Sequence, residues 1–160
     1  MVTDERALTH VDESGEATMV DVAGKDVTAR TATASGRLCT TAEVVTALRA
    51  ENLPKGDAVA VSRLAGMMGA KRTSDLIPLC HPIGLHKVSV DLEFNHDTVD
   101  ITAFAKTADR TGVEMEALTA VSVAGLTLID MVKAVDPAAY LTDIRVEEKT
   151  GGKTGTWQRV

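Results

Sequence analysis

Hydrophobic and polar residues alternate with two different periods along the chain, and the changes of period predict the order of its elements. Residues 88–94 alternate strictly between apolar and polar side chains, which is the pattern of a half-buried strand. A polar turn at residues 95–97 follows, and Val99, Ile101 and Ala103 then predict the return strand of a hairpin. This hairpin occupies the middle of the chain.

Two helices are predicted between an earlier strand, at residues 28–38, and the hairpin. Residues 40–43 have the spacing of a capping box, and apolar residues follow at helical intervals, which predicts a helix near residues 41–51. Asp57 is the predicted N-cap of the second helix. The apolar face of that helix consists of Val61, Leu64, Ala65 and Met68.

The pattern after the hairpin predicts one long helix and a last strand. The helix runs from Thr111 to Ala134, and the strand covers residues 144–147 before a tail rich in glycine and lysine. This order predicts an α+β ferredoxin-like sandwich, an antiparallel sheet with helices packed on it and an extra helix in the first crossover. Residues 1–27 are expected to form a flexible N-terminal arm, and residues 28–160 a single α+β domain.

Composition narrows the possible functions. A length of 160 residues with 44% hydrophobic content suits one globular domain, and the formal net charge of −6 argues against general nucleic-acid binding. No uninterrupted apolar run reaches about 18 residues, and the first residues lack the features of a signal peptide, so we expect a cytoplasmic protein and no membrane. Cys39 and Cys80 lie far apart and outside any zinc-binding spacing, which predicts reduced thiols and no metal site.

The segment from Lys71 to Pro82 concentrates reactive side chains between prolines. It contains two neighbouring cations, Cys80 and His81, and its prolines predict an extended backbone over residues 76–82. An imidazole on a stiff, non-helical segment is a candidate for proton transfer, although His81 could instead be a structural histidine. Cys80 is interpreted as a small buried residue rather than a nucleophile.

Carboxylates on the long helix are the second group of candidates. Glu114 follows Thr111 with the spacing of a capping box, so capping and chemistry are both open for it. Glu116 has no such structural explanation. Asp130 and Lys133 are three residues apart, which allows a solvated ion pair, but their apolar neighbours favour a functional role.

The remaining candidates are cations, and each of them taken alone could equally be a solvated surface charge. They are Lys55, Lys71, Arg72, Lys149 and Lys153. Residues 151–154 do not have the spacing of a P-loop, but glycine amides and two lysines there could approach phosphate oxygens. Several cations, a few carboxylates and one histidine, with no metal or cofactor signature, indicate acid–base chemistry on a small phosphorylated substrate.

Several segments in the same order resemble the MoaC family, the cyclic pyranopterin monophosphate synthases of molybdenum cofactor biosynthesis. The resemblance runs from about His10 to Lys153 and is carried by residues 19–22, 55–57, 70–73, 79–81, 110–120, 129–135 and 149–153. In one departure, Val132 stands where the family pattern often has cysteine.

The resemblance implies a lyase without a cofactor. Its substrate would be 3′,8-cyclo-7,8-dihydroguanosine 5′-triphosphate, derived from GTP, and its products cyclic pyranopterin monophosphate and pyrophosphate. Asp130 and Lys133 would be catalytic, together with Lys55 and His81. The implied substrate-binding residues are Leu79, Cys80, His81, Glu114, Met115, Glu116, Arg30, Lys71, Lys149 and Lys153.

The resemblance also implies partners. Family members form homohexamers, as trimers of dimers, with the site at the subunit interface. A radical S-adenosylmethionine enzyme would supply the substrate, and molybdopterin synthase would act downstream. Two alternatives remain at this stage: a non-catalytic nucleotide-sensing module, since ferredoxin-like folds host many such domains, and a scaffold for other biosynthetic enzymes.

Overall fold

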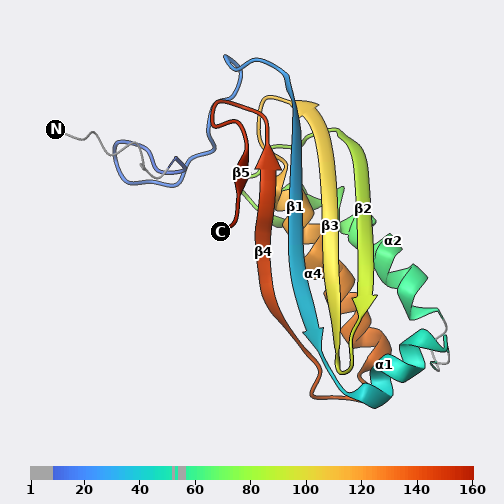
Figure 1. Cartoon of the computed structure of the whole chain (residues 1–160). Coiled ribbons are helices and arrows are strands. Elements are labelled where there is room, and N and C mark those ends of the chain that lie inside the picture. The colour runs from blue at the N-terminus through green and yellow to red at the C-terminus, as the bar shows by residue number, and fades with distance from the viewer. Residues whose placement is uncertain (1–8, 52, 54–56) are drawn as a thin grey trace.

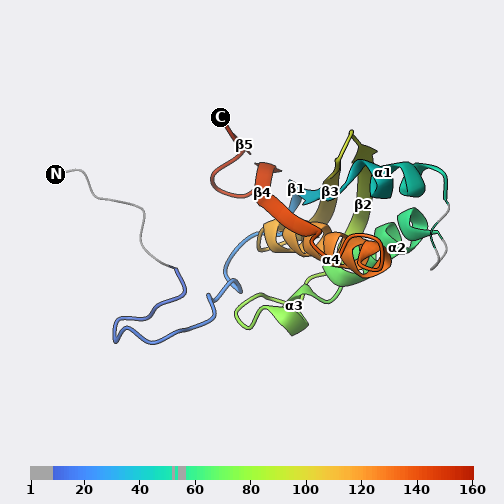
Figure 2. The same cartoon turned by 90° about the horizontal axis from the view of Figure 1, so that it is seen from below.

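A five-stranded antiparallel sheet, covered by helices on one face, forms the body of the protein. The computed structural model describes residues 9–51, 53 and 57–160. The strand order is β2-β3-β1-β4-β5, so β1 is the central strand and lies between β3 and β4 (Figure 1). This confirms the predicted ferredoxin-like arrangement. Seen from below, α2 and α4 lie together in one layer against the sheet (Figure 2).

The elements follow the predicted order, with two short additions. α3 and β5 were not predicted, and β4 is longer than the expected strand. Their bounds are β1 Thr28–Cys39, α1 Ala42–Arg49, α2 Ala58–Ala70, α3 Thr73–Leu76, β2 Leu85–Phe94, β3 Thr98–Asp109, α4 Glu114–Val132, β4 Tyr140–Thr150 and β5 Trp157–Gln158.

Local capping explains where the first two helices begin. The hydroxyl of Thr41 accepts a hydrogen bond of 3.3 Å from the amide of Val44, so the N-cap is Thr41 rather than Thr40 of the expected capping box. Asp57 caps α2 as predicted, because its carboxylate accepts a bond of 2.9 Å from the amide of Ala60. Both helices therefore start at positions that the sequence signals.

The core is built from small aliphatic side chains between α4 and the central strands. Ala32, Ala34 and Leu38 of β1 are buried, while the intervening residues point to the other face of the sheet. Ala120 and Ala124 of α4 are fully buried. Within the described part of the chain, α4 alone has the length and composition of a membrane span, but 56% of its apolar window is buried, as expected of a core helix.

The predicted apolar face of α2 is not the face that the structure buries. Val61, Leu64 and Met68 are 45%, 57% and 50% exposed. The buried side consists of small residues, namely Ala58, Ser62, Gly66, Gly69 and Ala70. Small residues face α4 because the two helices approach closely, and the large apolar residues of α2 therefore lie on the surface of the chain.

Gly66 lies where the backbones of α2 and α4 come close together. A Cβ atom there would lie 2.8 Å from the carbonyl oxygen of Ala120, a backbone atom that cannot move independently. We therefore expect Gly66→Val to lower the free energy of unfolding by about 1 to 3 kcal/mol, measured by urea denaturation. Ala60→Val, on the exposed side of the same helix, is the matched control. Equal stability of the two variants would contradict this packing.

Two local predictions are wrong. The proline-rich segment is not extended throughout: Thr73–Leu76 is a short helix, and the amide of Cys80 donates to the carbonyl of Ile77 at 3.1 Å to close a turn. Pro78 occupies the second position of that turn, which its fixed φ favours. The long helix begins at Glu114, three residues later than expected, because its N-cap is Val113 and no side chain caps it.

Candidate functional site

Glu114 and Lys149 form an ion pair where the first turn of α4 meets the end of β4. The ammonium of Lys149 lies 2.9 Å from Oε1 of Glu114, and both side chains are largely shielded. The capping-box interpretation of Glu114 is therefore wrong, because its carboxylate bonds to a lysine of the sheet. Its side chain folds over Gly112, where a Cβ atom would meet the carboxylate.

Glu116 is the most deeply buried carboxyl group near this ion pair. Its residue is only 4% exposed, and burial, assisted by the negative charge of Glu114, raises the pKa of Glu116 to about 7. Burial, with a contribution from Glu116, also raises the pKa of the Cys80 thiol. Glu116 can therefore hold or release a proton near neutral pH, whereas Cys80 is not activated as a thiolate.

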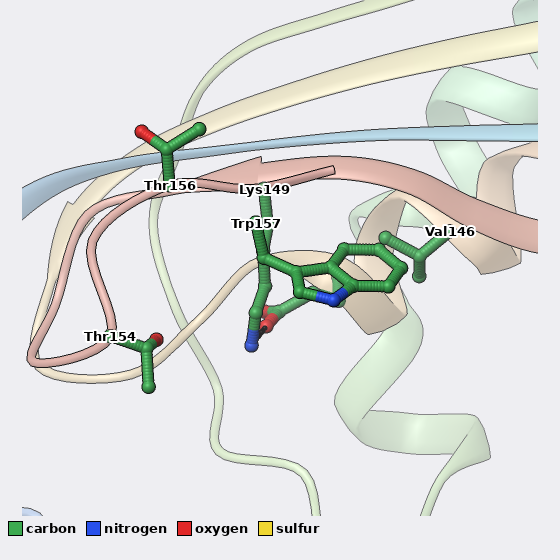
Figure 3. Close-up of a pocket in the computed structure, with 6 residues that line it drawn as sticks. Val146, Lys149, Thr154, Thr156 and Trp157 are labelled. Atoms are coloured by element: carbon green, nitrogen blue, oxygen red, sulfur yellow. Dashed lines mark hydrogen bonds and ion pairs between the residues drawn. The ribbon is translucent and has the colours of Figure 1, made fainter. Parts of the chain in front are cut away.

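A cavity of about 410 Å³ opens beside the ion pair; we call it the Trp157 cavity. Figure 3 shows the indole beside Lys149, with Val146 beyond the far edge of the ring and Thr156 turned to the opposite side. Its described lining residues are Glu114, Val146, Lys149, Thr154, Thr156 and Trp157. An aromatic and aliphatic wall thus adjoins one carboxylate and one ammonium.

A second cavity of about 520 Å³ collects positive charge, and we call it the Arg30 cavity. Its described lining residues are Gly24, Lys25, Asp26, Thr28, Arg30, Gly152, Lys153 and Thr154. Thr154 lines both cavities, so the two are neighbours across the turn that follows β4. Three cations and one carboxylate leave this cavity with an excess of positive charge.

Arg30 is held firmly in place. Its Nε donates to the carbonyl of Asp109 at 3.0 Å, and its Nη2 donates to the carbonyl of Arg110 at 3.3 Å. Gly152, at φ +74°, packs against the guanidinium, and a Cβ atom there would lie 2.4 Å from Nη1. A glycine is required at this position both for the backbone conformation and for the space that Arg30 occupies.

His81 lies against the N-terminal segment. Its Nε2 donates to the carbonyl of Val20 at 2.7 Å, which fixes the orientation of the ring. A third cavity, of about 530 Å³, adjoins His81 and includes residues 19–23, Arg110 and Thr111. The Nε of Arg110 donates to the carbonyl of Lys25 at 3.0 Å, which links this region to the Arg30 cavity.

Asp130 and Lys133 lie at the opposite end of α4. Their charged groups are 2.7 Å apart, and both side chains are more than half exposed within the protomer. Glu114 and Asp130 are sixteen residues apart on one helix, which corresponds to about 24 Å along its axis. A single copy of the chain therefore does not bring Asp130 and Lys133 to the cavities beside Glu114.

The other predicted site residues are divided between these regions. Leu79 and Cys80 are half-buried in the turn before His81, Met115 is exposed on the first turn of α4, and Lys71 is exposed at the end of α2. Lys55 lies outside the described residues. Among the residues that the structure describes, no group of three or more His, Cys, Asp or Glu side chains could hold a metal ion.

Sequence reasoning did not single out Lys25 or Trp157. Lys25 lies in a polar, glycine-containing stretch that resembles any solvated segment. Trp157 carried a usable signal, because it is the single tryptophan of a chain with 2% aromatic residues. Only the fold brings Lys25 next to Arg30 and Trp157 next to Glu114.

Together, the fold and these cavities define a ferredoxin-like protein with a cation-lined cavity beside a buried carboxyl group and an ion pair. Comparison with known proteins identifies the family. The sequence pattern of the MoaC family matches residues 19–152, and the chain belongs to that family.

Related proteins match over almost their whole length. The chain is 67% identical over 152 residues to the cyclic pyranopterin monophosphate synthase of Streptomyces avermitilis, covering 95% of this chain and 89% of the relative. It is 68% identical over 157 residues to the protein of that name from Nocardioides, covering 96% of each. Cyclic pyranopterin monophosphate synthase 2 of Mycobacterium tuberculosis is 59% identical over 152 residues, with 95% and 91% covered.

Proposed function

We propose that this protein is an enzyme of molybdenum cofactor biosynthesis, a lyase that forms cyclic pyranopterin monophosphate. Its substrate is 3′,8-cyclo-7,8-dihydroguanosine 5′-triphosphate, and pyrophosphate is the second product. The observation that carries the proposal is the pair of neighbouring cavities in a MoaC-family fold, one of which is lined by Lys25, Arg30 and Lys153. Such a cluster can offset the charge of a triphosphate and of a departing pyrophosphate.

The residues are proposed to divide the chemistry between them. Arg30 and Lys153 hold phosphate oxygens, with Lys149 between the phosphates and the ring, and Glu116 orients the ring. His81, Asp130, Lys133 and Lys55 transfer protons during the rearrangement of the purine-derived skeleton. Leu79, Cys80, Glu114, Met115 and Lys71 are proposed as further contacts.

Mass spectrometry tests the activity directly. The purified protein is given the enzymatically prepared cyclised GTP derivative, and cyclic pyranopterin monophosphate and pyrophosphate are measured. Formation of both products is expected. Tight binding of the substrate without turnover would instead favour a nucleotide-sensing module, an alternative that the names of the relatives do not favour.

We further propose a homohexamer, a trimer of dimers, in which each site is shared between subunits. Two observations support it. The separation of about 24 Å along α4 requires a second chain if Asp130 is to act beside Arg30. Large apolar residues are exposed on both helices of the layer, including Leu64 of α2 and Leu126 of α4, which is 60% exposed. Light scattering should then give a mass near six times the 16.9 kDa of the chain.

Complementation between variants tests the shared site. Asp130→Asn and Arg30→Ala are each expected to be inactive alone, because each removes one half of every site. Oligomers assembled from equal amounts of the two should recover about a quarter of the wild-type activity, since a quarter of the sites then combine two intact halves. Oligomers verified to be mixed that remain inactive would contradict a shared site.

The division into an arm over residues 1–27 and a domain over 28–160 stays a prediction, as does a cytoplasmic location. The proposed pathway neighbours are a radical S-adenosylmethionine GTP cyclase, which supplies the substrate, and molybdopterin synthase, which acts downstream. No nucleic acid, membrane or cofactor is part of the proposed reaction.

A further inference from the structure

Trp157 stands beside the ion pair because the chain reverses after β4. The amide of Gly155 donates to the carbonyl of Gly152 at 3.3 Å, and Gly155 adopts a φ of +64°. The returning strand β5 pairs Trp157 directly with Lys149, so the two side chains share one face of the sheet edge. The amide of Arg159 donates to the carbonyl of Glu147 at 2.8 Å and continues this pairing.

Burial in the protomer does not account for the position of the indole, which is 41% exposed. The guanidinium of Arg159 lies 5.6 Å from the ring centroid, within the range of a cation–π interaction. Arg159 is not among the described residues that line the Trp157 cavity, whereas Trp157 is. Arg159 thus contacts the indole, and the exposed part of the indole forms one wall of the cavity.

The chemistry of the cavity fits a guanine-derived ring. Guanine and the pterin formed from it share an edge on which a ring N–H and an amino group lie side by side, and a carboxylate can accept from both. Glu114 supplies that carboxylate, and Trp157 and Val146 supply the apolar surface. The volume of about 410 Å³ suits a bicyclic ring.

The neighbouring Arg30 cavity fits the other end of the same molecule. Thr154 belongs to both cavities, and the cations Lys25, Arg30 and Lys153 lie beyond it. A ligand with a planar ring at one end and phosphates at the other can therefore place each end in an environment of matching chemistry.

We propose that Trp157 is the stacking platform for the purine-derived ring of the substrate, with Glu114 accepting hydrogen bonds from the edge of that ring. This inference rests on the proposed function. It adds the residue by which the site distinguishes a ligand with a guanine-derived ring from a ligand that consists of phosphates alone. Stacking on an aromatic side chain contributes to the affinity of nucleic-acid bases by amounts that correspond to about 10- to 100-fold in Kd.

The single tryptophan makes the proposal directly measurable. GTP, used as a probe that carries the guanine ring, is expected to quench the fluorescence of Trp157, whereas inorganic tripolyphosphate should bind without quenching. By calorimetry, Trp157→Ala should weaken GTP binding about 10- to 100-fold and leave tripolyphosphate binding unchanged, while Trp157→Phe keeps most of the affinity for GTP.

The matched control is Tyr140→Ala, which removes an exposed aromatic residue from the other end of β4 and should leave GTP affinity unchanged. With the cyclised substrate, Trp157→Ala should raise KM about 10-fold or more and change kcat little. Three results would overturn the proposal: GTP does not bind, GTP binds to the wild type without quenching Trp157, or GTP binds to Trp157→Ala with the affinity of the wild type. A changed oligomer mass with unchanged GTP affinity would also overturn it and assign Trp157 to a subunit contact.

Failure of this inference is distinguishable from failure of the proposed function. If the wild-type protein forms cyclic pyranopterin monophosphate and Trp157→Ala retains its KM, only the stacking role is wrong. If the wild-type protein forms no product although GTP quenches Trp157, the ring site stands and the proposed reaction is wrong.

Discussion

Asp130→Asn is expected to abolish turnover of the cyclised GTP derivative while the fold and the affinity for ligand are largely retained. The variant keeps the shape of the side chain but cannot carry a proton as a carboxylate does, and removal of a general acid or base costs about 10²- to 10⁴-fold in rate. The change should be tolerated structurally, because the Asp130 side chain is 56% exposed in the protomer. Product formation by mass spectrometry measures the rate, and thermal unfolding monitors the fold.

Asp143→Asn is the matched control for Asp130→Asn. Asp143 is also an exposed aspartate, but it lies on β4 outside the proposed site, so its replacement should leave the rate unchanged. Turnover by Asp130→Asn at the wild-type rate would remove Asp130 from the mechanism. If the wild-type protein shows no turnover and Asp130→Asn binds the ligand weakly, the nucleotide-sensing alternative is favoured.

Glu116→Gln is expected to stabilise the protein at alkaline pH. Burial raises the pKa of Glu116 from 4.5 in the unfolded chain to about 7 in the folded one, so the folded state favours the neutral carboxyl group. The stability associated with this group is fully present below about pH 4.5 and is lost as the pH rises through 7. Above pH 7 the buried charge then costs on the order of 3 kcal/mol, a cost that glutamine avoids.

Urea unfolding at several pH values between 5 and 8 measures this effect. The protein concentration is held constant, because assembly also contributes to stability. Glu116→Gln should match the wild type most closely at pH 5 and exceed its free energy of unfolding most at pH 8. Glu13→Gln, which changes an exposed glutamate, should show no such divergence. A difference between Glu116→Gln and the wild type that does not change with pH would refute the assignment of a raised pKa.

The fold was predictable from the sequence because its main elements are specified locally. Strict alternation of apolar and polar residues over residues 88–94 fits a half-buried strand and does not fit a helix. The polar side chains of Thr41 and Asp57 satisfy amides within three residues, so these helix starts needed no knowledge of the rest of the chain. The order of elements then left a small number of topologies.

Predictions failed where a distant partner outweighed a local signal. The spacing of Thr111 and Glu114 predicted a capping box, but no side chain caps α4. The Glu114 carboxylate instead pairs with Lys149, which lies 35 residues further along the chain. The apolar stripe of α2 was visible in the sequence, but which side of the helix is buried depends on the small residues that let α2 approach α4. Neither outcome can be derived from spacing alone.

The sequence by itself determined the element order, the ferredoxin-like class and the resemblance to the MoaC family, because these depend on local periodicity and on contiguous motifs. Only the tertiary structure decided which candidates meet. It brings Glu114 to Lys149 and Arg30 to Lys153, raises the pKa of Glu116 by burying it, and places Trp157 beside the ion pair. It also keeps Asp130 at the far end of α4, because a helix is rigid and rises by about 1.5 Å per residue.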